Sequence, residues 1–191
     1  MNVFILCTGR NGSVTFLRAC QHLENFTTGH ESRAKYTGPA RMDYPDNHIE
    51  ADNRLSWMLG KLGKKYGNNA YYVHITRDRE ATANSFNRRW DFKNSIIKAY
   101  THGILMRQED VGLEFCLDYY DTVNNNIDYF LRDKTNVMRL KLETMKEDFP
   151  KFLKWIGAEG DLKMAVKEWD YKHNPSRTRS RWELFTSILK K

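Results

Sequence analysis

The residues best suited to chemistry lie in a glycine-containing segment near the start of the chain. Thr8-Gly9-Arg10-Asn11-Gly12-Ser13 follows the apolar run 3–6 and precedes apolar residues of helical period over 16–23. Strand, glycine loop and helix together bind phosphate-like anions, because the first N–H groups of the helix have no partner inside it and its dipole favours negative charge. Arg10 adds a positive charge that can bind an oxyanion through two hydrogen bonds.

This loop differs from the phosphate loop of nucleotide triphosphatases. That loop needs Gly-Lys-Ser/Thr after four spacer residues, whereas Gly12 is followed directly by Ser13. No acidic residue for magnesium stands out on a second strand. We therefore expect a phosphate or sulfate ligand with no metal ion required.

A second segment carries groups of the same kind. Residues 71–76 form a β-rich run, and the acidic residues that follow are typical of the first turn of a helix. Arg77 then stands at the carboxyl end of the strand, and Ser85 follows about two helical turns later. Both side chains can face the crevice where open α/β sheets bind ligands.

Together these segments resemble the sulfotransferases that use 3′-phosphoadenosine-5′-phosphosulfate (PAPS). Residues 9–14 resemble the 5′-phosphosulfate loop of that family, usually Pro-Arg/Lys-Ser-Gly-Thr/Ser-Thr/Ser. Arg77 and Ser85 resemble its 3′-phosphate pair, and residues 137–145 resemble a later segment often written Val-x-Arg-Tyr-Glu-Asp-Leu. Two positions depart from the family pattern. Gly9 replaces the proline that usually begins the loop, and Arg79 replaces the proline that usually follows Arg-Asp.

The resemblance implies a three-layer α/β/α fold with a mainly parallel central sheet, similar to the P-loop nucleotide-binding folds. It also implies transfer of a sulfuryl group from PAPS to a hydroxyl or amine, with release of adenosine 3′,5′-bisphosphate. Arg10 would neutralise the leaving phosphate and act in catalysis. The residues that would bind the donor are Arg10, Asn11, Gly12, Ser13, Val14, Arg77 and Ser85. Val14 replaces a hydroxyl residue, so one side-chain contact to the phosphosulfate can be missing.

Sulfuryl transfer needs a base that takes the proton of the acceptor hydroxyl. The tyrosylprotein branch of the family carries Gly-Glu-Glu-Thr-Arg, with its second Glu as base. This chain carries Gly29-His30-Glu31-Ser32-Arg33 after a short expected strand. The resemblance favours Glu31 as the base, with His30 as the alternative. His102 stays a weaker alternative, and His74 is expected in the core. The residues expected to contact the acceptor are His30, Arg33, Tyr36, Arg41 and His48.

A basic segment near the C-terminus is a further candidate. Arg177, Arg179 and Arg181 stand at every second position, which suits an ordered loop over a polyanion. Sulfotransferases often close the donor site with such a segment. Their usual Arg-Lys-Gly is absent here, so the likeness is one of position. We expect these arginines to contact the donor.

Composition limits the class of protein. The chain has 191 residues, 40% of them hydrophobic, with a net charge of +7 and three cysteines. We expect one domain over 1–191 and reduced cysteines in the core. No stretch approaches the roughly 20 apolar residues of a membrane span, and no signal peptide is evident, so we expect a cytoplasmic protein. The basic charge suits a polyanionic donor better than nucleic acid, because it forms no stripe interleaved with aromatics.

The remaining helices and strands are predicted from the spacing of apolar residues along the chain. We expect a turn-rich loop over 34–49, a strand over 136–142, and helices over 50–66, 97–105, 116–131, 149–156, 162–169 and 181–191.

Two other functions stay open on this architecture. One is a kinase-like phosphotransferase, and the other is a non-catalytic nucleotide-binding protein. The sequence identifies neither the acceptor nor the oligomeric state.

Overall fold

The structure is a computed structural model that describes residues 1–92, 94–107, 112–171 and 173. Its centre is a parallel five-stranded sheet in the order β2-β3-β1-β4-β5. The strands are β1 (Asn2–Leu6), β2 (Thr27–His30), β3 (His48–Ala51), β4 (Ala70–Thr76) and β5 (Val137–Lys141). The expected α/β fold with a parallel sheet is confirmed.

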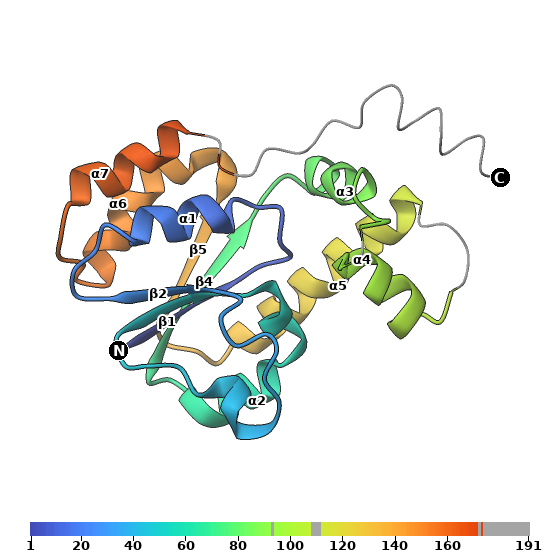
Figure 1. The fold of residues 1–191 in the computed structure, drawn as a ribbon, viewed down its shortest axis with the longest axis horizontal. Coiled ribbons are helices and arrows are strands. Elements are labelled where there is room, and N and C mark those ends of the chain that lie inside the picture. The colour runs from blue at the N-terminus through green and yellow to red at the C-terminus, as the bar shows by residue number, and fades with distance from the viewer. Residues whose placement is uncertain (93, 108–111, 172, 174–191) are drawn as a thin grey trace.

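Helices cover both faces of the sheet, which completes three layers (Figure 1). One face carries α1 (Ser13–Cys20), α6 (Met145–Trp155) and α7 (Leu162–Lys167). The other carries α2 (Leu59–Tyr66), α3 (Arg79–Asn87), α4 (Ile96–Lys98) and α5 (Leu113–Leu131). Short 3₁₀ helices span Gly38–Met42, Asn53–Trp57, Leu142–Thr144 and Glu168–Asp170, and a π-helix spans Ala99–Ile104.

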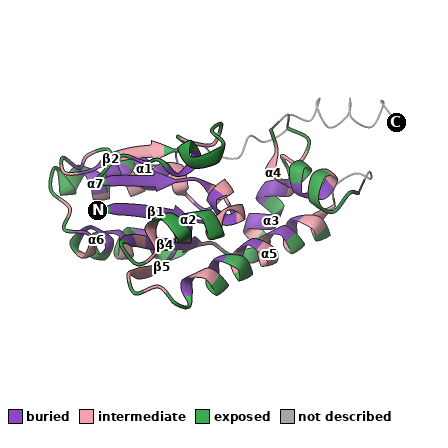
Figure 2. Cartoon of the chain, turned by 90° about the horizontal axis from the view of Figure 1, so that it is seen from below, coloured by how far each residue is buried: buried purple, intermediate pink, exposed green. Residues whose placement is uncertain are grey.

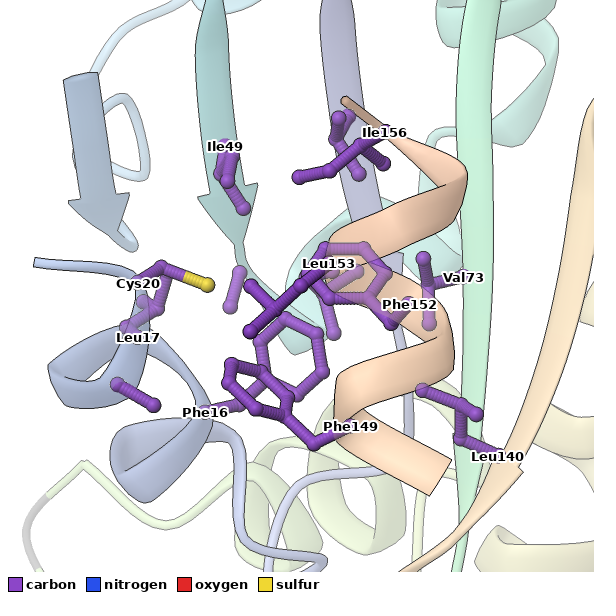
Figure 3. Close-up of a cluster of buried hydrophobic side chains, with 14 of the residues drawn as sticks. Phe16, Leu17, Cys20, Ile49, Val73, Leu140, Phe149, Phe152, Leu153 and Ile156 are labelled. Carbon is purple, nitrogen blue, oxygen red and sulfur yellow. The ribbon is translucent and has the colours of Figure 1, made fainter. Parts of the chain in front are cut away.

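The burial of β1 on both faces explains why its residues 3–6 are all apolar rather than alternately apolar and polar. Val3 and Ile5 pack into the core under α1 and α6, while Phe4 and Leu6 pack into the opposite core. Figure 2 shows this strand buried between the layers. Figure 3 shows the first core, where the rings of Phe16 and Phe149 lie 5.1 Å apart, edge to face. Burial on both faces fixes β1, and therefore the loop that follows it.

Two expectations for residues 34–66 are wrong. Residues 48–51 form a buried strand between β1 and β2 rather than the end of a loop and the start of a helix. The predicted helix is also divided, into the 3₁₀ helix Asn53–Trp57 and α2. The strand escaped prediction because His48 and Glu50 are polar, yet their side chains are only 6% and 0% exposed and pair with each other.

Part of the expected site falls on residues that the structure does not describe. Arg177, Arg179, Arg181 and the helix predicted over 181–191 lie outside the described residues. Within the described part of the chain, no helix has the length and apolar character needed to cross a membrane.

His74 gives a pH-dependent test of the packing between β4 and α5. Its side chain is buried, Nε2 lies 2.8 Å from Asn124 Oδ1, and Nδ1 lies 3.3 Å from Asp128. Burial lowers the pKa of His74 below its usual value. The unfolded chain therefore binds a proton near pH 6.5 that the folded protein resists. We expect the free energy of unfolding to fall more steeply for wild type than for His74→Gln between about pH 7 and pH 5. Urea titrations across this range measure it, and parallel curves would contradict it.

Candidate active site

The loop between β1 and α1 has an unusual backbone. Gly9, Arg10 and Gly12 all have positive φ values, of 86°, 61° and 85°. The φ of Gly12 strains any other residue, and a Cβ there would come within 2.6 Å of Leu142 Cδ1 and displace that side chain. The first hydrogen bond of α1 runs from the Phe16 N–H to the Gly12 carbonyl, at 2.9 Å. The N–H groups of residues 13–15 thus have no partner inside the helix and are suited to an anion.

The loop is held from behind by buried hydrogen bonds. Asn11 is fully buried, and its Nδ2 donates to the Ile75 carbonyl of β4 at 2.6 Å. The Thr8 carbonyl accepts from the Tyr119 hydroxyl at 2.9 Å and from Asn53 Nδ2 at 3.3 Å. The Asn11 side chain is therefore an anchor, and the loop offers backbone rather than this amide to a ligand.

The two segments singled out in the sequence meet at Arg10. Arg77 Nη1 donates to the Arg10 carbonyl at 3.0 Å, and Arg10 Nε donates to Ser85 Oγ at 3.1 Å. Ser85 is fully buried in α3. Burial, together with the charges of Arg89, Arg77 and Arg88, lowers the pKa of Arg10 to about 10. Such a cluster of like charges favours the binding of an anion.

A cavity of about 540 Å³ opens on one side of the loop. Arg10 and Arg77 line it together with residues 12–15, so the helix N-terminus and two guanidinium groups face the same space. Sequence reasoning missed its opposite wall, which comes from the segments after β5 and α7. The residues of that wall are Leu142, Glu143, Met145, Lys146, Trp169, Tyr171 and His173.

A second cavity of about 700 Å³ opens on the other side of the same loop. It shares Arg10, Ser13 and Val14 with the first cavity. Its other lining residues are Gly9, His30, Glu31, Asn53, Arg54, Phe86, Arg89, Phe92, Asn94, Ser95 and Ile96. The loop is thus a common wall, and a group held at its N–H groups can be reached from both cavities.

Glu31 stands at the carboxyl end of β2, as predicted, and lines the second cavity. Its N–H donates to the Ala51 carbonyl at 3.0 Å, and its φ is 52°. Glu31 Oε2 lies 2.5 Å from Arg54 Nη1, and each side chain is about one third exposed. The Arg54 N–H in turn donates to Asp52 Oδ1 at 2.8 Å. Glu31 is therefore oriented by Arg54 and stays accessible.

A buried network fixes the turn that carries Glu31. The fully buried Glu50 carboxylate accepts hydrogen bonds from the Ser32 N–H at 2.8 Å and from Ser32 Oγ at 2.6 Å. His48 Nε2 lies 3.0 Å from Glu50 Oε2, and His48 Nδ1 lies 2.8 Å from Thr27 Oγ1. The network passes over Gly29, where no side chain would fit.

The other predicted acceptor residues are distributed differently. His30 lines the second cavity, whereas Arg33 and Tyr36 are absent from the described lining of both cavities. The Arg33 guanidinium instead lies 5.0 Å from the centre of the exposed Tyr36 ring. The prediction that Arg41 and His48 contact the acceptor is wrong. Arg41 is buried in an ion pair with Asp52, and His48 is buried against Glu50, so neither faces an acceptor.

Comparison with solved structures identifies the fold. The chain matches the sulfotransferase domain from the curacin biosynthetic pathway with a TM-score of 0.54 and 10% identity, over 98% of this chain and 96% of that one. It matches mouse sulfotransferase SULT7A1 complexed with PAP with a TM-score of 0.61 and 13% identity, over 88% of this chain and 63% of that one. It matches a sulfotransferase from Alicyclobacillus acidocaldarius with a TM-score of 0.51 and 13% identity, over 99% and 90%.

The chain therefore has the sulfotransferase fold, at low sequence identity. Comparisons with protein-family models and with curated protein sequences give no match.

Gly29 tests the network beneath Glu31. A methyl group on Gly29 would overlap Glu50 Oε2 and crowd His48 and Ser32, whereas one on Gly60 of α2 would meet open space. We expect Gly29→Ala to lower the free energy of unfolding by about 1–3 kcal/mol, as overpacking of a buried site does. Gly60→Ala, the matched control, should stay within about 1 kcal/mol of wild type. Urea denaturation measures both, and equal stabilities would contradict the network.

Proposed function

We propose that this protein is a PAPS-dependent sulfotransferase. Its acceptor group is a hydroxyl, with an amine as the second candidate. The observation that carries the proposal is that one anion-binding loop lines two cavities. Arg77 lines the cavity on one side, and the accessible carboxylate of Glu31 lines the other. Transfer of a charged group between two substrates needs this arrangement, because donor and acceptor must approach the same group from opposite sides.

In the proposed reaction the acceptor oxygen attacks the sulfur of PAPS. A new bond forms between that oxygen and sulfur, and the bond between sulfur and the bridging phosphate oxygen breaks. The acceptor proton passes to the Glu31 carboxylate, and adenosine 3′,5′-bisphosphate (PAP) leaves. Negative charge then develops on the leaving phosphate, where Arg10 and the N–H groups of residues 11–14 stabilise it.

The larger parts of the donor have candidate partners in the first cavity. Arg77 is proposed to bind the 3′-phosphate, with Ser85 as its partner. The Ser85 hydroxyl accepts a hydrogen bond from Arg10 in this structure. Trp169 and Tyr171 offer aromatic faces to the adenine, and Tyr171 is 55% exposed. The C-terminal arginines, a cytoplasmic location and a single domain over 1–191 stay predictions from the sequence.

The alternative functions differ in what they bind. A kinase-like phosphotransferase would bind ATP with magnesium, but the loop lacks the lysine that such enzymes place after the glycine. A non-catalytic protein would bind PAP and transfer nothing. Glu31 supports a transferase over a non-catalytic protein, which has no need of a carboxylate in the second cavity, and the missing lysine supports the sulfotransferase over the kinase.

PAP binding tests the donor site. We expect calorimetry without magnesium to show that PAP binds more tightly than 5′-AMP or ATP, because Arg77 recognises the 3′-phosphate. Arg77→Ala should weaken PAP binding by about ten- to a hundredfold, the value of a charge-assisted hydrogen bond. Arg79→Ala is the matched control, because Arg79 pairs with Asp121 on the surface and should leave PAP binding within about threefold.

Two outcomes would contradict the donor assignment. One is unchanged PAP affinity in Arg77→Ala. The other is a preference of wild type for ATP with magnesium, which would favour the kinase-like function.

Glu31→Gln tests the base. The amide keeps the shape of the side chain but cannot take the acceptor proton, so we expect kcat to fall by about 10²–10⁴ with PAP affinity nearly unchanged. Transfer of ³⁵S from labelled PAPS measures it. His30→Gln is the comparison, since His30 lines the same cavity. A large loss in His30→Gln with little in Glu31→Gln would move the base to His30.

A further inference from the structure

The cavity that holds Glu31 is lined mainly by positive charge. Arg10, Arg54 and Arg89 line it, and Glu31 is the one carboxylate among its described lining residues. The charge of Arg54 is balanced by carboxylates, because its Nη1 lies 2.5 Å from Glu31 Oε2 and 3.9 Å from Asp52 Oδ1. Arg10 also lines the first cavity, where the donor anion is proposed to bind. Arg89 is thus left as the cation that belongs to the second cavity alone.

Arg89 has no anionic partner within the described part of the chain. Its Nε is buried and has no hydrogen-bond partner there. Its guanidinium lies 4.9 Å from the centre of the Phe92 ring, and its N–H donates to the Phe86 carbonyl at 2.8 Å, which fixes the backbone. Arg79, by contrast, pairs with Asp121. A buried guanidinium N–H without a partner is costly unless a ligand satisfies it.

Apolar side chains lie beside this charge. Phe86, Phe92 and Ile96 line the same cavity, and Phe92 is 41% exposed. A ligand that satisfies both surfaces has an apolar body and an anionic group. The cavity also continues outward, because Arg54 and residues 94–96 line a third cavity of about 490 Å³ together with Lys98 and His102. No carboxylate lies among the described residues of that extension, so its charge is positive too.

We propose that the acceptor is a hydroxyl compound with an aromatic or apolar body and an anionic group that binds Arg89. This inference rests on the proposed function, because it places the acceptor hydroxyl beside Glu31. It goes beyond that function by stating the charge of the acceptor. A carboxylate, phosphate or sulfate would bind a guanidinium in the same way, through two parallel hydrogen bonds.

Three phenols of similar size and different charge test the proposal. They are 4-hydroxyphenylacetate, its neutral amide 4-hydroxyphenylacetamide, and the cation tyramine. Their affinities for the protein are measured by calorimetry with and without PAP, which needs no turnover. We expect the anion to bind about ten- to a hundredfold more tightly than the amide, and tyramine to bind most weakly. 4-Hydroxyphenyl phosphate and sulfate then show which anionic group is preferred.

Variants of Arg89 connect the preference to this residue. Arg89→Met should reduce the ratio of anion to amide affinity to within about threefold of one, and Arg89→Glu should reverse it in favour of tyramine. Arg88→Met is the matched control, because Arg88 is exposed, also acts on the charge of Arg10, and is absent from the described lining. It should keep the wild-type ratio.

Three outcomes would overturn the inference. They are equal affinities for the three phenols, no binding of the anion at millimolar concentration, or an anion preference that survives in Arg89→Met. A loss of PAP affinity in Arg89→Met as large as the loss of anion affinity would assign Arg89 to the donor instead. Failure of the proposed function is separate, since it appears as absent PAP binding in wild type.

Discussion

The site depends on a backbone that turns through left-handed conformations between β1 and α1. Gly12 has a φ of 85°, which favours glycine, and the chain turns there into α1, whose first N–H groups have no partner inside the helix. Arg10 shares this conformation, with a φ of 61°. A non-glycine residue adopts it at an energetic cost, so its neighbours must stabilise it. The hydrogen bond from Arg77 to the Arg10 carbonyl and the Asn11 anchor on β4 do so.

The same turn concentrates positive charge around one loop. Burial and the charges of Arg89 and Arg77 lower the pKa of Arg10. Burying like charges opposes folding, so their presence around one loop points to a ligand of opposite charge. The carboxylate of Glu31 forms an ion pair with Arg54. It shares the second cavity with Arg10 and Arg89, whereas Arg77 lines the first cavity together with Arg10.

Precision at Glu31 comes from residues that never face a ligand. β2 is an edge strand and is partly exposed, so burial alone does not fix its end. The Glu50 carboxylate, held in β3 and fully buried, binds both the N–H and the hydroxyl of Ser32. A buried carboxylate is stable only when its oxygens are satisfied, and here they are satisfied by the turn that must be positioned. Stability and site geometry are therefore coupled through one side chain.

Several elements are specified by residues that are close together in the chain. The buried strand at 3–6, the glycine loop, the amphipathic pattern of 116–131 and the spacing of Arg77 and Ser85 are set by neighbouring residues. With the family resemblance they predicted the fold, and the anion site stays a prediction. Only the tertiary structure decided the rest. The strand at 48–51 depends on pairing between His48 and Glu50, and Trp169 reaches the first cavity only because α7 packs on α1. Arg89 likewise becomes a cavity residue only when α3 meets the loop after β1. Such contacts join residues far apart in the chain, and no local period records them.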